Sequence, residues 1–103
     1  MKKILLGNTK LEITPVGMGV LPIGPNQRCL PVEDGARIIR HALERGINFI
    51  DTAQYYQTSP YIKEALRGTN FDPIISSKCL GDDYKTMEMA IEEARRDMDR
   101  DVI

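Results

Sequence analysis

The sequence of 103 residues contains no tryptophan, a single histidine and only two cysteines. Cys29 and Cys79 lie far apart, and neither belongs to a closely spaced pair of the kind that holds a metal ion. The sequence therefore predicts no metal site. Two isolated cysteines also favour reduced thiols over a disulfide framework, and reduced thiols are typical of a cytoplasmic protein.

Long hydrophobic runs and an excess of one charge are missing as well. No apolar stretch approaches the roughly 20 residues of a membrane-spanning helix, and polar residues 7–10 interrupt the apolar start too early for a signal peptide. The net charge is -1, with acids and bases interspersed. We therefore expect neither a membrane nor nucleic acid as a partner. A hydrophobic share of 42% and a charged share of 28% are typical of one small folded domain.

The chain alternates short apolar runs with amphipathic stretches. Residues 2–6 and 11–13 flank a turn and predict a β-hairpin. The pattern then predicts strands at 16–20, 48–51 and 73–78 and helices at 31–45, 60–67 and 84–98, with 101–103 as the start of a fourth strand. This order is typical of parallel βα units with right-handed crossovers. Residues 16–20 form a compact apolar run, which favours a buried strand.

Two of the predicted helices have an apolar face at helical spacing. In 31–45 that face is expected to contain Ile38, Ile39, Ala42 and Leu43, and in 84–98 it is expected to contain Met87, Ala90, Ile91, Ala94 and Met98. Gly46 and Gly68 follow the first two helices and are natural helix ends.

An acid, a phenol and an amine follow neighbouring predicted strands. Asp51 ends the second strand, Tyr56 follows shortly after it, and Lys78 ends the third. Because α/β folds gather catalytic side chains at the carboxyl ends of parallel strands, we expect these three groups to meet. A positively charged amine favours loss of the phenol proton, and a carboxylate neutralises and orients that amine. The trio therefore indicates a proton donor.

Each member of the trio also has a structural interpretation. Asp51 could cap the turn that follows it, Tyr56 could be a packing aromatic with a solvated hydroxyl, and Lys78 could be an ordinary exposed lysine. Tyr55 fits the role of a packing aromatic better than Tyr56 does. Lys78 follows small and apolar residues of a buried strand, so it needs a counter-ion, and Asp51 is the natural one.

These residues carry a resemblance to a known family. The stretch 46–53 (Gly-Ile-Asn-Phe-Ile-Asp-Thr-Ala), followed by Tyr56 and then by Ser77-Lys78, resembles the amino-terminal part of an aldo-keto reductase, and the similarity covers all 103 residues. The resemblance implies an α/β fold, the amino-terminal part of a (β/α)8 TIM barrel. Residues 1–103 would be a single incomplete domain, with 1–14 as a hairpin across the barrel bottom and 15–103 as the first three βα units.

The resemblance also implies a function. Members of the family reduce aldehydes and ketones with NADPH, less often with NADH, so the expected partner is a small-molecule carbonyl substrate. The family's catalytic residues fall on Asp51, Tyr56 and Lys78. Its cofactor contacts near the nicotinamide fall on Asp51 and on the backbone of Gly19, Val20 and Leu21.

Several positions depart from the family pattern. The family usually follows its tyrosine with glycine and then, one residue on, Ser-Glu, whereas this chain has Gln57-Thr58-Ser59-Pro60, so the tyrosine loop is expected to differ. Arg95 and Asp99 replace a usual Leu and Gly, so the end of the last helix is expected to pack loosely. The family's catalytic histidine lies beyond Ile103, as do most contacts to the cofactor phosphates. His41 lies on a helix and cannot replace that histidine.

Three interpretations of the short chain remain open. It is a fragment of a larger reductase, a non-catalytic half-barrel that needs a partner chain, or a self-contained small α/β binding module. Because the barrel fold needs about 250 residues, residues 1–103 alone are expected to be inactive. An uncovered sheet edge would favour self-association.

Overall fold

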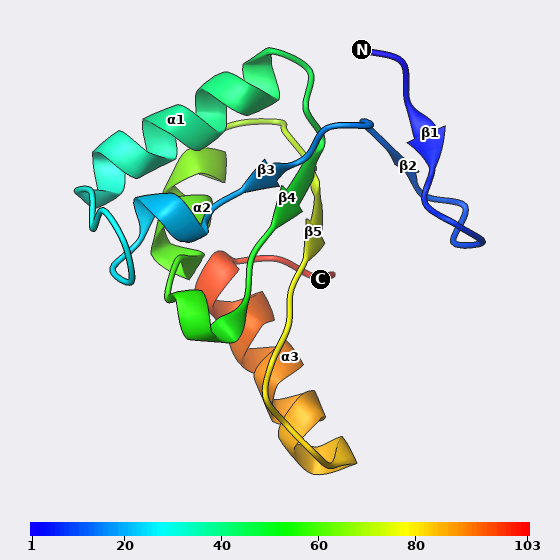
Figure 1. The fold of residues 1–103 in the computed structure, drawn as a ribbon, viewed down its shortest axis with the longest axis vertical. Helices are drawn as coiled ribbons and strands as arrows, with labels where there is room; N and C mark the ends of the chain where they lie inside the picture. Colours follow the sequence, from blue (N-terminus) through cyan, green and yellow to red (C-terminus); the bar gives the residue numbers. More distant parts are fainter.

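The computed structural model describes all residues from Met1 to Ile103, and it begins with a hairpin. Strands β1 (Ile4–Leu5) and β2 (Glu12–Ile13) pair antiparallel, which confirms the predicted hairpin with shorter strands. Figure 1 shows the hairpin standing to one side of the other elements. Asn48 ties it to the main sheet, because its side-chain oxygen accepts from Thr14 N at 2.7 Å and its amide nitrogen donates to Glu12 O at 2.9 Å.

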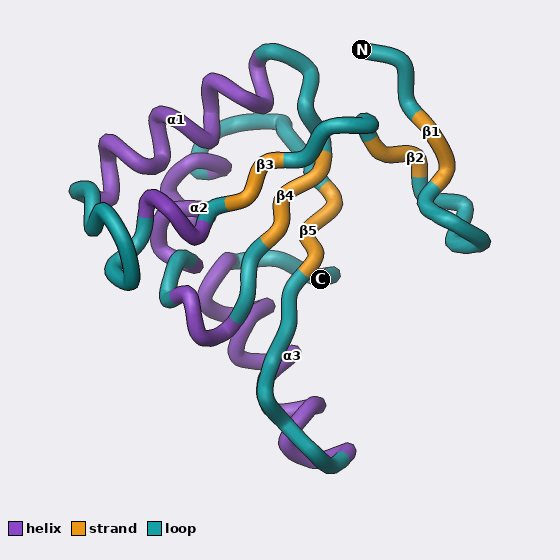
Figure 2. Tube along the Cα trace, in the orientation of Figure 1, coloured by secondary structure: helices purple, strands orange, loops and turns teal.

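The main sheet has three parallel strands, β3 (Met18–Gly19), β4 (Phe49–Asp51) and β5 (Ile74–Ser76), with β4 in the middle. Figure 2 shows the three strands side by side. The prediction of a buried strand over 16–20 was wrong in its extent. Val16 is 56% exposed and only Val20 is fully buried, because pairing with β4 begins at Met18.

Helices α1 (Val32–Glu44) and α2 (Ser59–Leu66) cover one face of this sheet and pack against each other. The core lies between these two helices and the strands, and its buried members include Ile39, Ile50 and Ile62. Gly35 allows the close approach of the helices, because a Cβ atom there would lie 2.3 Å from the ring of Tyr61.

This close approach corrects the predicted face of α1. The buried residues are Gly35, Ala36, Ile39 and Leu43, whereas Ile38 is 44% exposed. The helix is rotated toward its smallest side chains, since glycine and alanine let α2 approach more closely than isoleucine would. The predicted ends are confirmed, with Gly46 at φ +99° and Gly68 at φ +72°.

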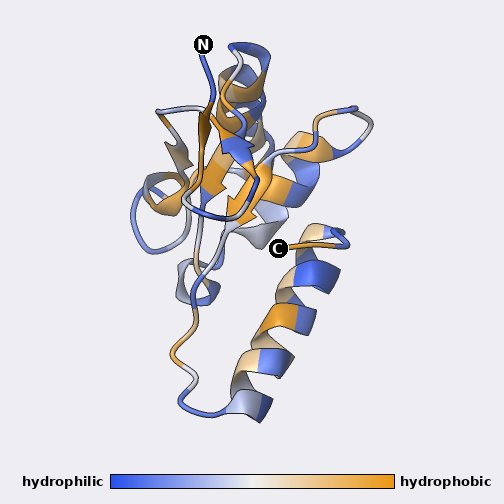
Figure 3. Ribbon diagram, turned by 90° about the vertical axis from the view of Figure 1, so that its right-hand side faces the viewer, coloured by the Kyte–Doolittle hydropathy of each residue, from blue (hydrophilic) through white to orange (hydrophobic).

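Helix α3 (Tyr84–Met98) has the predicted bounds but not the predicted burial. Of its expected apolar face, Met87 and Ile91 are 42% and 47% exposed, and only Met98 is buried. Figure 3 shows α3 leaning away from the sheet over most of its length. The expectation that the end near Asp99 packs loosely was wrong. That end is the part of α3 that reaches the core, and Asp99 takes the left-handed conformation (φ +55°) that terminates the helix.

Residues 101–103 form no strand, so the prediction of a fourth strand start was wrong for this structure. They make no backbone hydrogen bond to β5. A strand in this sheet would need a series of such bonds to its neighbour. Val102 is 77% exposed, while Ile103 packs partly against the core. None of the helices has the length and hydrophobicity that crossing a membrane would require.

Candidate active site

Asp51 and Lys78 meet at the carboxyl end of the sheet. Asp51 is the last residue of β4 and is paired in register with Ser76, the last residue of β5, and Lys78 lies two residues beyond Ser76. The Lys78 Nζ atom lies 2.8 Å from Asp51 Oδ1 and also donates to Thr52 O at 2.8 Å. The side chains are 50% and 47% exposed, so the pair contributes about 1 kcal/mol or less to stability. Its main consequence is the fixed position of the ammonium.

Tyr56 completes the cluster from a separate turn. It ends the 3₁₀ turn η2 (Gln54–Tyr56), which follows β4, and the Lys78 Nζ atom lies 5.4 Å from the centre of its ring. At this distance the ammonium is attracted to the ring face. Tyr55 points to solvent and is 73% exposed. The structure therefore brings Asp51, Tyr56 and Lys78 together and leaves Tyr55 outside.

Two hydrogen bonds hold the turn that carries Tyr56. Gln54 N donates to Lys78 O at 2.9 Å, which joins the turn to the chain beyond β5. The Asn26 side chain donates to Tyr55 O at 2.9 Å. Gln57, which follows Tyr56, has φ +56°. Glycine adopts this left-handed conformation without strain, whereas glutamine adopts it at some cost. The turn after Tyr56 therefore stays left-handed although Gln57 replaces the family's usual glycine.

The residues expected near a nicotinamide lie beside Asp51. Gly19 is in register with Asp51, and a Cβ atom built on it would meet nothing within 4 Å. Val20 N donates to Asp51 O at 3.1 Å while the Val20 side chain is fully buried, so only its backbone can face the site. Leu21 then begins the 3₁₀ turn η1 (Leu21–Ile23). The side of Gly19 on which a Cβ atom would lie is therefore open.

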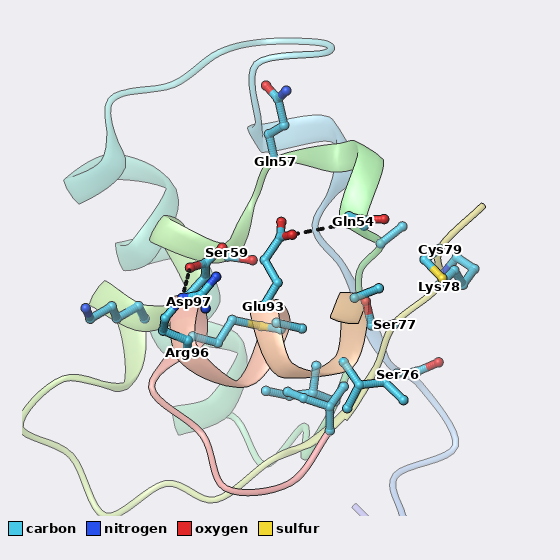
Figure 4. A pocket seen from close by; sticks show the side chains of 18 of the residues that line it. Gln54, Gln57, Ser59, Ser76, Ser77, Lys78, Cys79, Glu93, Arg96 and Asp97 are labelled. Atoms are coloured by element: carbon cyan, nitrogen blue, oxygen red, sulfur yellow. Dashed lines mark hydrogen bonds and ion pairs between the residues drawn. The ribbon is translucent and has the colours of Figure 1, made fainter. Parts of the chain in front are cut away.

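A cavity lies beside the cluster, between β5, α2 and α3. Its volume is about 910 Å³, and among the residues that line it are Gln54, Ile91, Glu93 and Lys78. Figure 4 shows Gln54 and Glu93 joined across it, and their side chains lie 3.4 Å apart. Asp51 and Tyr56 do not line this cavity. We therefore assign it to the incomplete packing of α3 rather than to the carbonyl site.

Sequence reasoning missed the residues that support the cluster. Asn26 bonds to Tyr55 O from a distant loop, and Thr58, which follows the tyrosine turn, has its hydroxyl oxygen 2.8 Å from that of Thr52. No local sequence signal indicates either contact. His41 lies in the last turn of α1, which leads into the first residue of β4, whereas Asp51 is the last residue of β4, so His41 takes no part in this site. Both cysteines are free thiols.

Two ionisable groups outside the cluster are perturbed. Burial raises the pKa of Tyr61, and the nearby Cys29 charge adds to the effect. Hydrogen bonds from Thr86 lower the pKa of Asp83, the residue that caps α3. Neither group contacts Asp51 or Lys78, so both report on the packing of the helices rather than on the site.

Comparison with known proteins identifies a family. A sequence model described as "Aldo/keto reductase family" matches residues 15–103. Among curated proteins, L-galactose dehydrogenase from Arabidopsis thaliana is 32% identical over 100 residues, which are 91% of this chain and 31% of the relative. The uncharacterized oxidoreductase YqkF from Bacillus subtilis (strain 168) is 30% identical over 81 residues, which are 76% of this chain and 25% of the relative. The chain thus spans less than a third of either.

Solved structures agree with this assignment. A putative aldo-keto reductase from Pseudomonas aeruginosa is 26% identical with a TM-score of 0.80, and the match covers 96% of this chain and 42% of that one. The aldo-keto reductase AKR11C1 from Bacillus halodurans, in a holo form, is 25% identical with a TM-score of 0.76, and the match covers 100% of this chain and 38% of that one. The predicted fold class is confirmed. The three parallel strands and their helices form part of a (β/α)8 barrel, with the sheet open rather than closed.

Proposed function

Because the chain belongs to the aldo/keto reductase family, we propose that the protein is an oxidoreductase that reduces the carbonyl group of a small aldehyde or ketone to an alcohol. The observation that carries this proposal is the position of the Lys78 ammonium. It is bonded to the Asp51 carboxylate and lies over the Tyr56 ring. This arrangement supports proton donation to a carbonyl oxygen beside the end of β4.

Each residue has a defined part in the proton step. The Tyr56 O–H bond breaks as its proton passes to the carbonyl oxygen, and the electron pair left on the phenol oxygen is stabilised by the Lys78 charge. Asp51 holds Lys78 in place and balances its charge. Solvent can return a proton to Tyr56, because Tyr56 is itself only partly buried.

The chemistry that a bound nicotinamide cofactor, NADPH or in second place NADH, would supply is hydride for the carbonyl carbon. The residues present fit its reactive end, because Gly19 leaves open space in register with Asp51. We propose that the backbone of Gly19, Val20 and Leu21 and the Asp51 side chain hold this end.

We further propose that residues 1–14 close the bottom of the barrel and that 15–103 supply its first three βα units. Residues 1–103 contain Asp51, Tyr56 and Lys78 but no histidine near them. We therefore expect no turnover from residues 1–103 alone, and full activity only when the other strands of the barrel are present.

The test is the loss of NADPH in the presence of an aldehyde, measured for a protein in which residues 1–103 are joined to the other strands of the barrel, and for two matched variants of that protein. Tyr56→Phe removes the proton donor and should lower kcat by about 100- to 10,000-fold while cofactor binding persists. Tyr55→Phe removes the neighbouring exposed hydroxyl and should leave kcat unchanged. Near-normal turnover of Tyr56→Phe would contradict the assignment of the donor, and an inactive wild-type protein would contradict the proposed reaction.

A second candidate function is that of a non-catalytic half-barrel that binds a partner chain. The exposed apolar side chains of α3, Tyr84, Met87 and Ile91, and the outer edge of β5 favour it. Light scattering, which detects a complex, and the NADPH assay together distinguish the two functions. A stable complex without NADPH-dependent reduction supports the binding module, whereas reduction supports the enzyme.

A further inference from the structure

Two buried threonine hydroxyls connect the segment that carries Tyr56 to the end of β4. Thr52 and Thr58 are 2% and 0% exposed, and their side-chain oxygens lie 2.8 Å apart. A buried hydroxyl that loses its partner stays unsatisfied, since water cannot replace the bond. This bond therefore closes the loop between Thr52 and Thr58, and Tyr56 lies within that loop.

The hydroxyl of Thr58 is not used in the way its position suggests. Thr58 is the N-cap residue of α2, where threonine commonly accepts a hydrogen bond from a backbone amide of the first turn. Its side chain makes no such bond. Gly24 packs against the methyl group of Thr58, because a Cβ atom on Gly24 would lie 2.4 Å from that methyl. The side chain is thus held on one side by Gly24 and bonded on the other side to Thr52.

Thr52 contacts the remainder of the site through its backbone. Its N–H donates to Ser76 O at 2.8 Å, which anchors it to β5, and its carbonyl accepts from Lys78 Nζ at 2.8 Å. The same residue therefore contacts the Lys78 ammonium and, through its hydroxyl, the loop of Tyr56. We infer that Thr58, acting through Thr52, is a positioning residue that sets the place of the Tyr56 ring relative to the Lys78 ammonium. This inference rests on the proposed function of the site.

The kinetic test compares three variants of the protein in which residues 1–103 are joined to the other strands of the barrel. Thr58→Val keeps the volume and removes the hydroxyl, and Thr58→Ser keeps the hydroxyl. Thr14→Val is the matched control, because Thr14 is 1% exposed and its hydroxyl donates to Val16 O at 2.7 Å and accepts from Asn48 N at 3.3 Å, both outside the Tyr56 loop. We expect kcat to fall at least about tenfold in Thr58→Val with KM for the cofactor unchanged, since small misplacements of reacting groups cost this much. Thr58→Ser should recover most of kcat, and Thr14→Val should retain it.

A second readout needs no activity. Labelling with 3-fluorotyrosine places a fluorine on every tyrosine, including the four of residues 1–103, and Tyr56→Phe identifies the ¹⁹F resonance of Tyr56. We expect this resonance to move in Thr58→Val, to return in Thr58→Ser and to stay in place in Thr14→Val. An unchanged Tyr56 resonance in Thr58→Val, or equal displacement in the valine and serine variants, would overturn the inference. A wild-type protein without carbonyl reduction would instead overturn the proposed function and leave the fluorine experiment valid.

Discussion

The two halves of the helical layer differ in how they meet the sheet. Helices α1 and α2 pack on each other and on the strands, and they contribute Ile39, Leu43 and Ile62 to the core. Helix α3 contributes Met98 as its only buried residue and leaves a cavity of about 910 Å³ between itself and the sheet. An amphipathic pattern therefore produces a helix in both halves, but it buries that helix only where a partner surface is available.

The candidate site spans both halves. Asp51 and the turn of Tyr56 belong to the tightly packed half, whereas Lys78 lies on the segment that leads to α3. Lys78 is held by two hydrogen bonds of its side chain, to Asp51 and Thr52, and by a third that its backbone carbonyl accepts from Gln54 N. The position of the ammonium thus depends on the packed half, and loosening of α3 should affect it less than loosening of α1 or α2.

The largest expected effect is on stability. Ile39→Ala removes a fully buried side chain and should lower the free energy of unfolding by about 2–5 kcal/mol. Ile91→Ala is the matched change on α3, where the side chain is 47% exposed, and it should cost about 0.5 kcal/mol or less. Urea unfolding measures both. Equal losses would show that α3 is as well packed as α1 and would remove the distinction between the halves.

An intermediate effect concerns alkaline pH and the packed half. The Tyr61 hydroxyl donates to Leu30 O at 2.6 Å, and burial raises the pKa of Tyr61 above its ordinary value of 10.0. The unfolded chain therefore loses this proton first, so the stabilisation is complete below pH 10.0 and falls as pH rises toward the folded-state pKa.

Urea unfolding across this range tests the Tyr61 prediction. The wild-type protein should lose stability with rising pH more steeply than Tyr61→Phe, which cannot ionise at this position. At neutral pH the free energy of unfolding of Tyr61→Phe should be lower than that of the wild type by about 0.5–1.5 kcal/mol, the usual contribution of one hydrogen bond. Identical pH slopes in the two proteins would contradict the prediction.

Sequence patterns predicted those features that depend on order and periodicity. The alternation of strands and helices, the helix ends at Gly46 and Gly68 and the meeting of Asp51 with Lys78 all follow from the parallel βα order. The buried face of α1 did not follow, because the apolar pattern selects Ile38, whereas close packing against Tyr61 selects Gly35.

Contacts between distant or weakly patterned residues were not predictable. The bond between Thr52 and Thr58 joins two hydroxyls whose common role in turns and caps predicts other partners. The exposure of Met87 depends on what faces α3, which an amphipathic pattern alone does not specify. The catalytic roles of Asp51, Tyr56 and Lys78 stay predictions, because geometry shows that they meet but not what they do.

The smallest expected effect concerns acidic pH and the beginning of α3. Asp83 accepts a hydrogen bond from Thr86 N at 2.7 Å, and bonds from Thr86 hold the pKa of Asp83 below its ordinary value of 3.8. The stabilisation of the helix start is thus present above pH 3.8 and is lost as pH falls through the folded-state pKa. The amide proton of Thr86, followed by NMR, should titrate with a midpoint below 3.8.

Asp83→Asn separates this titration from acid effects elsewhere in the chain, because asparagine caps a helix nearly as well as aspartate but has no charge to lose. In this variant the Thr86 amide should show no titration, while α1 behaves as in the wild type, since α1 begins without a side-chain cap. A Thr86 titration that persists in Asp83→Asn would show that acid acts on α3 through another group. The start of α3 would then not depend on the Asp83 cap, although α3 reaches the core only at its other end, through Ala94 and Met98.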